Sequence, residues 1–203
     1  MSRPRAVLDA SVLYQEPLRS LLLWIAVEGG FEPFWSERIL AETADNLLAA
    51  AVVTPRQWNR LSAALLDAFP GASLDQAAIG AIEAKMPNHE KDRHVLAAAV
   101  VGEIEIVITS NLRHFQAAEL APLGKRALAP DAFLCELLER APNIVRAALD
   151  RQVAHMHRPR RWSLAELLGR LRGLGAGDPL AAGFAAAAER ELGLKAAPPP
   201  QKR

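Results

Sequence analysis

Three acidic residues in separate segments of the chain have the types and positions expected of a cation-binding site. Asp9 ends the apolar run VLDA, Glu42 lies in the helical pattern ERILAETADNLLAAA, and Asp92 begins DRHVLAAAVVG. A buried carboxylate without a partner is unfavourable by several kcal/mol, so Asp9 needs a partner or a function. Like charges brought close together repel unless a cation lies among them. Carboxylates are hard oxygen ligands, so the expected ion is Mg²⁺ or Mn²⁺.

Polar residues also follow the clearest strand pattern in the chain, IEIVITS at 104–110. This strand ends at Thr109 and Ser110, and Asn111 comes directly after it. In an open parallel sheet, ligands bind beyond the carboxyl ends of the strands, where the strand order reverses. We therefore expect the acids and these strand-end residues to share one crevice.

Each residue of this group also has an ordinary structural interpretation. Asp92 could cap the helix that it begins, since Asp is a common capping residue. Glu42 could be a solvated helix carboxylate, and Asn111 could only close a strand. The functional interpretation therefore depends on their joint arrangement.

Strand-like and helix-like segments alternate over the first 130 residues, which is typical of a parallel sheet covered by helices. Short strands are predicted at 5–10, 31–35, 104–110 and 125–130. Helices are predicted at 18–28, 37–51, 54–69, 75–85 and 92–102. The predicted fold class is α/β, a three-layer α/β/α arrangement with a central parallel sheet, followed by an all-helical C-terminal extension.

The chain is predicted to divide near residue 135, after which only helical patterns occur. We predict one domain over 1–135, a helical extension over 136–193 and a disordered, proline-rich tail over 194–203. Residues 1–135 carry 12 Lys and Arg against 16 Asp and Glu, a net charge of −4, whereas residues 136–203 carry 12 against 7, a net charge of +5. A basic extension attracts phosphate.

The composition is that of an ordinary globular protein, with 51% hydrophobic and 23% charged residues. No run approaches the length of a membrane span, and the first residues lead directly into a predicted strand. We therefore expect no membrane span and no signal peptide. Cys135 is the single cysteine, so an intramolecular disulfide is excluded, which fits a reducing cytoplasm.

Four motifs occur together in the order and spacing of the PIN-domain ribonucleases: VLDASVLY, WSERILAE, NHEKDRHVLAAAV and IVITSNLRHF. Over about residues 5–135, the chain resembles in particular the VapC-type toxins of bacterial toxin–antitoxin pairs. The resemblance implies a PIN-like parallel sheet between helices and a cluster of acids that holds Mg²⁺ or Mn²⁺. It also implies cleavage of RNA by a metal-activated water.

The resemblance assigns roles to individual residues. Asp9, Glu42 and Asp92 match the metal-binding acids, and Asn111 stands at the fourth position of the catalytic set. Ser11 matches the small polar residue that usually follows the first acid by two. The resemblance further implies that the protein acts on RNA, forms a homodimer and is silenced by a cognate antitoxin protein.

Two positions depart from the family pattern. Many PIN domains have Asp where this chain has Asn111, and one branch has a second acid where this chain has His114. The missing charge favours an alternative function, a catalytically impaired PIN-like module that only binds RNA or a partner. His114 then either contacts RNA phosphate or lies on the surface, and Arg93 either contacts RNA or pairs with an acid. A haloacid-dehalogenase-type phosphatase is disfavoured because it requires an acid at the position of Ser11.

The basic extension contains a segment, AHMHRPRRW, that combines arginines with an aromatic residue. Arg158, Arg160 and Arg161 lie close to Trp162. This combination suits single-stranded RNA, in which phosphates pair with cations and bases stack on aromatic rings. The alternative is a solvated loop between two helices.

Changing Arg158, Arg160 and Arg161 to Ala together tests this assignment. We expect weaker RNA binding. We also expect the slope of log affinity against log salt concentration to flatten by about one to two units, because a protein that contacts fewer phosphates releases fewer counterions on binding. Fluorescence anisotropy over a salt series measures both quantities, and metal binding should not change. Affinity and slope at wild-type values would restrict RNA recognition to residues 1–135.

Overall fold

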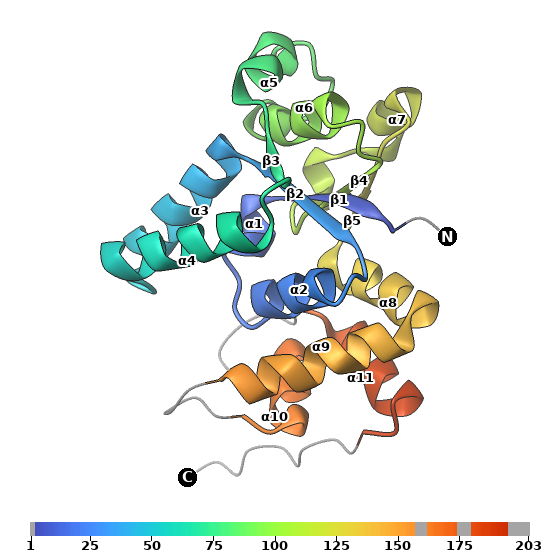
Figure 1. Cartoon of the computed structure of the whole chain (residues 1–203). Coiled ribbons are helices and arrows are strands. Elements are labelled where there is room, and N and C mark those ends of the chain that lie inside the picture. The colour runs from blue at the N-terminus through green and yellow to red at the C-terminus, as the bar shows by residue number, and fades with distance from the viewer. Residues whose placement is uncertain (1–2, 157–161, 174–179, 195–203) are drawn as a thin grey trace. The chain divides into compact units, whose positions relative to one another are not determined.

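A computed structural model describes residues 3–156, 162–173 and 180–194 (Figure 1). The chain divides into two compact units. The first contains residues 1–14 and 31–129, and the second contains residues 15–30 and 130–203. The sequence-based division into residues 1–135, 136–193 and 194–203 stays a prediction. The two units differ from it mainly because residues 15–30 belong to the second unit. Of the tail predicted over 194–203, only Leu194 lies within the described residues.

The first unit is built on a sheet of five parallel strands. These are β1 (Arg5–Leu8), β2 (Glu32–Ser36), β3 (Ser73–Leu74), β4 (Ile106–Ile108) and β5 (Arg126–Leu128). The strand order is β3-β2-β1-β4-β5. Because β2 lies on one side of β1 and β4 on the other, the strand order reverses between β1 and β4. The carboxyl ends of these two strands are therefore the place where a ligand site is expected.

Helices pack along this sheet in the predicted α/β manner. They are α1 (Ala10–Leu13), α3 (Glu37–Ala49), α4 (Pro55–Ala68), α5 (Gln76–Glu83), α6 (Arg93–Val101) and α7 (Ala117–Leu120). Three 3₁₀ turns complete the unit: η1 (Glu90–Asp92), η2 (Leu112–His114) and η3 (Ala121–Leu123). The predicted fold class, a central parallel sheet with helices and a helical C-terminal region, is confirmed.

Glu42 lies in α3 and Asp92 directly precedes α6, and each of these helices is held in place by a simple local feature. Helix α6 contacts β1, β2 and β4, and its Ala97, Ala98 and Ala99 are fully buried. These small side chains let the helix lie close to the sheet. Helix α3 begins at the buried Ser36, whose hydroxyl accepts a hydrogen bond from the backbone N–H of Ile39 at 3.2 Å.

The second unit is helical throughout its described residues. It contains α2 (Leu18–Val27), α8 (Pro130–Arg140), α9 (Pro142–His155), α10 (Leu164–Leu171) and α11 (Ala182–Glu191). Helix α2 lies alongside α9 (Figure 1), although the two are far apart in the sequence. The buried Gln152 joins them, since its Nε2 donates to the carbonyl of Pro17 at 3.0 Å. None of the described helices has the length and apolar character needed to cross a membrane.

The last helix, α11, is capped by a residue of another helix. Its own N-cap residue, Ala181, has no side chain that could cap it. Instead, the carboxylate of Asp131 in α8 accepts hydrogen bonds from the backbone N–H groups of Gly183 at 3.2 Å and Phe184 at 2.8 Å. A negative charge at this end of a helix is also favourable for its dipole. Asp131 therefore ties α11 to α8.

Asp131→Ala should lower the free energy of unfolding of the second unit by about 1–2 kcal/mol, the usual effect of losing a helix cap. Gly183→Ala should act in the same direction, because an added Cβ would lie 2.7 Å from the Asp131 carboxylate. Urea unfolding followed by circular dichroism measures both variants. Asp150→Ala is the control, since it removes only an exposed ion pair with Arg146 and should cost under about 0.5 kcal/mol. Equal losses for Asp131→Ala and the control would contradict the capping role.

Candidate functional site

Asp9 lies at the reversal of strand order and is held by side chains from both neighbouring strand ends. Its backbone N–H donates to the carbonyl of Ile108 at 3.0 Å, so the ladder between β1 and β4 continues to the first residue beyond β1. Its carboxylate is buried, with the residue 2% exposed. The hydroxyls of Ser11 and Thr109 both donate to Oδ2 at 2.6 Å. The other oxygen, Oδ1, accepts neither of these bonds.

The same two hydroxyls also hold the loop that follows β4. The Ser11 hydroxyl accepts a hydrogen bond from the backbone N–H of Ser110 at 3.1 Å. The Thr109 hydroxyl accepts one from the backbone N–H of Asn111 at 3.0 Å. The structure thus brings Ser11, Thr109, Ser110 and Asn111 to the Asp9 carboxylate or to its direct neighbours, as their positions in the sequence suggested.

The pKa of Asp9 lies above the ordinary value of an aspartate, and burial is the largest cause. The hydrogen bonds from Ser11 and Thr109 lower this pKa and only partly offset the burial. The negative charge of Asp92 raises it further, while His94 lowers it. Asp9 and Asp92 are therefore close enough to repel each other, which is the condition that favours a cation.

Glu42 is paired and half-buried, unlike a free solvated carboxylate. Its Oε2 lies 3.2 Å from Nε2 of the fully buried His94, and its Oε1 accepts a hydrogen bond from Arg38 Nε at 3.2 Å. Burial raises the pKa of Glu42, but His94 and Arg38 together outweigh it, so the net pKa is below the ordinary value. Arg38 itself is anchored on Glu83 at 2.7 Å.

Like His89 near Asp92, His94 is a residue of this site that sequence reasoning missed. It acts electrostatically on both Asp9 and Glu42, so it connects the strand end with helix α3. The signal in the sequence was one histidine in the otherwise apolar stretch HVLAAAVV. This signal does not reveal which acids the histidine faces, because that depends on how α6 and α3 pack.

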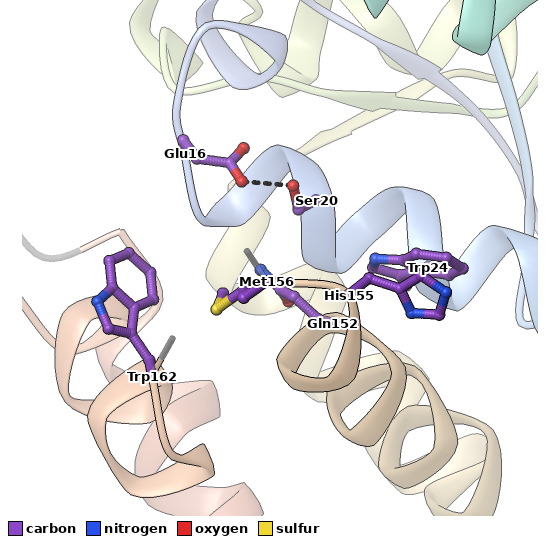
Figure 2. Close-up of a pocket in the computed structure, with 7 residues that line it drawn as sticks. All are labelled: Glu16, Ser20, Trp24, Gln152, His155, Met156 and Trp162. Carbon is purple, nitrogen blue, oxygen red and sulfur yellow. Dashed lines mark hydrogen bonds between the residues drawn. The ribbon is translucent and has the colours of Figure 1, made fainter. Parts of the chain in front are cut away.

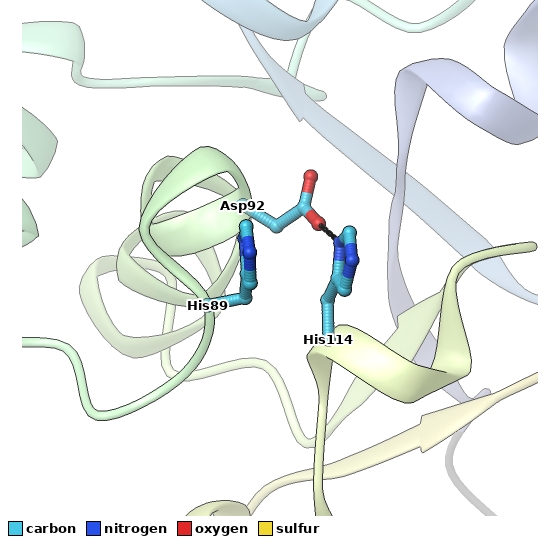
Figure 3. A group of neighbouring side chains, drawn as sticks. All are labelled: His89, Asp92 and His114. Atoms are coloured by element: carbon cyan, nitrogen blue, oxygen red, sulfur yellow. Dashed lines mark hydrogen bonds and ion pairs between the residues drawn. The ribbon is translucent and has the colours of Figure 1, made fainter.

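Asp92 faces two histidines (Figure 3). It occupies the N-cap position of α6, yet its side chain makes no capping hydrogen bond. Its Oδ2 lies 2.5 Å from Nδ1 of His114. The ring of His89 stacks on that of His114 with 4.1 Å between the centroids. The sequence left open whether His114 contacts phosphate or only lies on the surface, whereas the structure places it against an acid of the site.

Arg93 is oriented by the backbone beside Asp92. Its Nε donates to the carbonyl of Asn88 at 3.3 Å. The Asn88 side chain is buried and donates in turn to the carbonyl of Asp92 at 3.0 Å. Within the described part of the chain, this hydrogen bond of the Arg93 side chain goes to a backbone carbonyl and not to a carboxylate. The sequence had offered pairing with an acid as one of its two roles.

A pocket of about 260 Å³ lies in the second unit (Figure 2). Figure 2 shows Trp162 and Trp24 on opposite sides of it. Its lining residues are Glu16, Ser20, Trp24, Gln152, His155, Met156 and Trp162. Trp162 is the aromatic residue that the sequence grouped with Arg158, Arg160 and Arg161. These three arginines lie outside the described residues.

Two comparisons with known proteins found a similarity. The family model of the VapC50 C-terminal domain matches residues 130–182. A relative, "Putative ribonuclease VapC50" of Mycobacterium tuberculosis (strain ATCC 25618 / H37Rv), is 46% identical over 66 residues. The resemblance to VapC-type PIN toxins is confirmed. The aligned part covers 32% of this chain and 39% of the relative. No solved structure matches the chain.

The family match falls in the region where the sequence indicated only helices. Residues 130–182 include α8, α9 and α10, which pack together in the second unit. This helical region is therefore similar to a C-terminal domain of VapC50 type. The acids of the first unit were found separately, by their motifs and by their geometry.

Asp9→Asn tests the electrostatics of the strand-end site. A native pKa above the unfolded value of about 3.8 means that the folded state binds the proton more tightly. Stability is then lost as the pH rises from that value through the native pKa. In metal-free buffer the variant should therefore unfold at a higher temperature than the wild-type protein near pH 7, and the difference should vanish below about pH 4.

Thermal unfolding in EDTA across this pH range measures the difference. The exposed Asp67 gives the matched control, since Asp67→Asn removes one charge outside the cluster. A gain in stability that persists at low pH would assign the effect of Asp9→Asn to packing and not to charge.

Proposed function

We propose that the chain is a metal-dependent endoribonuclease of the PIN type, the toxin of a VapBC-type toxin–antitoxin pair. The observation that carries this proposal is the buried Asp9 at the reversal of strand order, within electrostatic reach of Asp92. Two acids that repel in a buried crevice suit a divalent cation. The similarity to VapC50 supports a ribonuclease function of the same type.

The acids Asp9, Asp92 and Glu42 would hold Mg²⁺ or Mn²⁺, with Asn111 supplying a neutral oxygen at the fourth position. The bound ion would activate the attacking water and neutralise charge on the scissile phosphate. Ser11 and Thr109 orient the Asp9 carboxylate by bonding Oδ2 only, which presents Oδ1 for binding.

The charge on Glu42 is already shared with His94 and Arg38. Glu42 would therefore hold the cation less strongly than Asp9, and its pairing with His94 links α3 to α6. Arg93 and His114 stand beside Asp92, where the backbone of the RNA would pass. Additional RNA contacts are assigned to Arg158, Arg160 and Arg161.

Further proposals follow from the family resemblance. The protein would act on RNA in the cytoplasm as a homodimer, and a cognate antitoxin would cover the acidic crevice. No membrane association is proposed.

The second candidate function is a PIN-like module that binds RNA or a partner without cleaving. The observation that favours it is the pair of Asn111 and His114 at positions where related proteins carry acids. His114 also occupies Oδ2 of Asp92, which a cation would otherwise use.

Cleavage of a mixed single-stranded RNA substrate distinguishes the two functions. We expect cleavage that requires Mn²⁺ or Mg²⁺, stops with EDTA, and is lost in Asp92→Asn. Asp9→Asn should weaken Mn²⁺ binding by about tenfold or more, because it removes a charged ligand from the cluster. Gel analysis of the RNA and calorimetric Mn²⁺ titration measure these effects.

Asp75→Asn serves as the control, since Asp75 only caps α5 through the N–H groups of Ala77 and Ala78. It should cleave RNA as the wild-type protein does. Intact RNA binding with no cleavage by the wild-type protein would favour the second candidate. Cleavage that survives both EDTA and Asp92→Asn would contradict the metal mechanism.

A further inference from the structure

His89, Asp92 and His114 converge because two short turns are joined side by side. His89 precedes η1 and lies three residues before Asp92. A 3₁₀ turn has three residues per turn, so these two side chains project from the same side. His114 ends η2, and the backbone N–H of His89 donates to the carbonyl of His114 at 3.3 Å. Segments about 20 residues apart in the sequence thus present three metal-ligating groups together (Figure 3).

The spacing of these groups is close to that of a metal centre. One ligand atom from each of the three side chains lies within 4.8 Å of the other two. Ligands about 2.0–2.2 Å from a tetrahedral zinc ion are roughly 3.3–3.6 Å apart, so the widest separation in the cluster would close by about 1 Å. The hydrogen-bonded pair Asp92 Oδ2 and His114 Nδ1, 2.5 Å apart, would open by a similar amount as the ion replaces the shared proton. His89 is exposed and can supply the closing shift. Its ring is restrained by a hydrogen bond from the Lys91 N–H at 3.3 Å and by stacking on His114.

The donor set selects the kind of ion. Two imidazole nitrogens and one carboxylate form the ligand set of catalytic zinc sites, in which water takes the remaining position. Mg²⁺ prefers oxygen ligands and binds imidazole poorly. The cluster therefore favours a divalent ion that accepts nitrogen ligands, which separates it from the all-oxygen set assigned to Mg²⁺ above.

Burial and charge favour a cation at this position. Asp92 is 9% exposed and experiences the like charge of the buried Asp9. The side chain of His114 is 17% exposed, so the inner part of the cluster is shielded from water. The exposed His89 leaves one open side, through which an ion can enter.

We propose that His89, Asp92 and His114 form a binding site for a first-row divalent transition ion of the Zn²⁺ type. Asp92 belongs both to this site and to the proposed Mg²⁺ ligands, so the two ions compete for its carboxylate. Zn²⁺ held by the two histidines would occupy the Asp92 carboxylate and so oppose the binding of Mg²⁺.

Calorimetric titration of the metal-free full chain with Zn²⁺ tests the site directly. The wild-type protein should bind one Zn²⁺ at this cluster. His89→Ala and His114→Ala should each weaken that binding by about tenfold or more, since each removes one of three ligands. Glu90→Gln is the matched control, because it removes an exposed charge next to His89 without removing a member of the cluster. It should bind Zn²⁺ as the wild-type protein does.

A second readout identifies the ligands independently of affinity. Co²⁺ in place of Zn²⁺ should show the intense visible absorption of a low-coordinate site, and this band should be lost in His89→Ala. His155→Ala, in the second unit, should keep the band. Circular dichroism of each variant confirms that it is folded, and His89→Ala carries the test should His114→Ala unfold.

The outcomes separate this proposal from the proposed ribonuclease function. Zn²⁺ binding that persists unchanged in both histidine variants would overturn the site, even where Mn²⁺ binding and RNA cleavage proceed as proposed. Retained Zn²⁺ binding in Asp9→Asn, together with weakened Mn²⁺ binding, supports two sites that share Asp92. Zn²⁺ binding that depends on both histidines supports the site even where no RNA is cleaved.

Discussion

The burial of one carboxylate between two adjacent strand ends is the constraint on which the first unit's site depends. Asp9 is desolvated, and the hydroxyls of Ser11 and Thr109 compensate only part of that penalty. The same hydroxyls accept the backbone N–H groups of Ser110 and Asn111. The course of the chain after β4, and with it the turn that carries His114, therefore depends on how Asp9 is held.

Imidazole groups accompany the other two acids. His94 lies against Glu42, and His114 lies against Asp92. His94 lowers the pKa of Glu42 and of Asp9 and so favours their charged forms. Each ring also occupies a carboxylate oxygen that a cation would use. A cation at this site would therefore compete with two imidazole rings for carboxylate oxygens. A site made of carboxylates alone has no such competition. His114, with Asn111, is one of the two positions at which the sequence departs from the PIN-domain pattern that it resembles.

The second unit is built from two segments that are far apart in the sequence. Helix α2 lies between β1 and β2 in the sequence, yet it packs on α9 through the contact of Gln152 with Pro17. Asp131 joins α8 to α11 within the same unit. The similarity of residues 130–182 to the VapC50 C-terminal domain therefore concerns helices that form a common core with an N-terminal helix.

The sequence by itself determined the local structure and the motifs. Short apolar runs predicted β1, β2, β4 and β5, and their alternation with helical patterns predicted a parallel sheet. The two-residue strand β3 and the single-turn helices α1 and α7 were missed, because periodicity cannot be read from so few residues.

Only the tertiary structure decided how the chemical groups meet. The acids could be named from their motifs, but the contacts of His94 with Glu42 and of His114 with Asp92 and His89 could not. The physical reason is that each contact joins elements far apart in the chain, and its geometry is set by the packing of α6 against α3 and of one turn against another. Residue types and spacing indicate which side chains can bind an ion, whereas packing decides which of them face the same point in space.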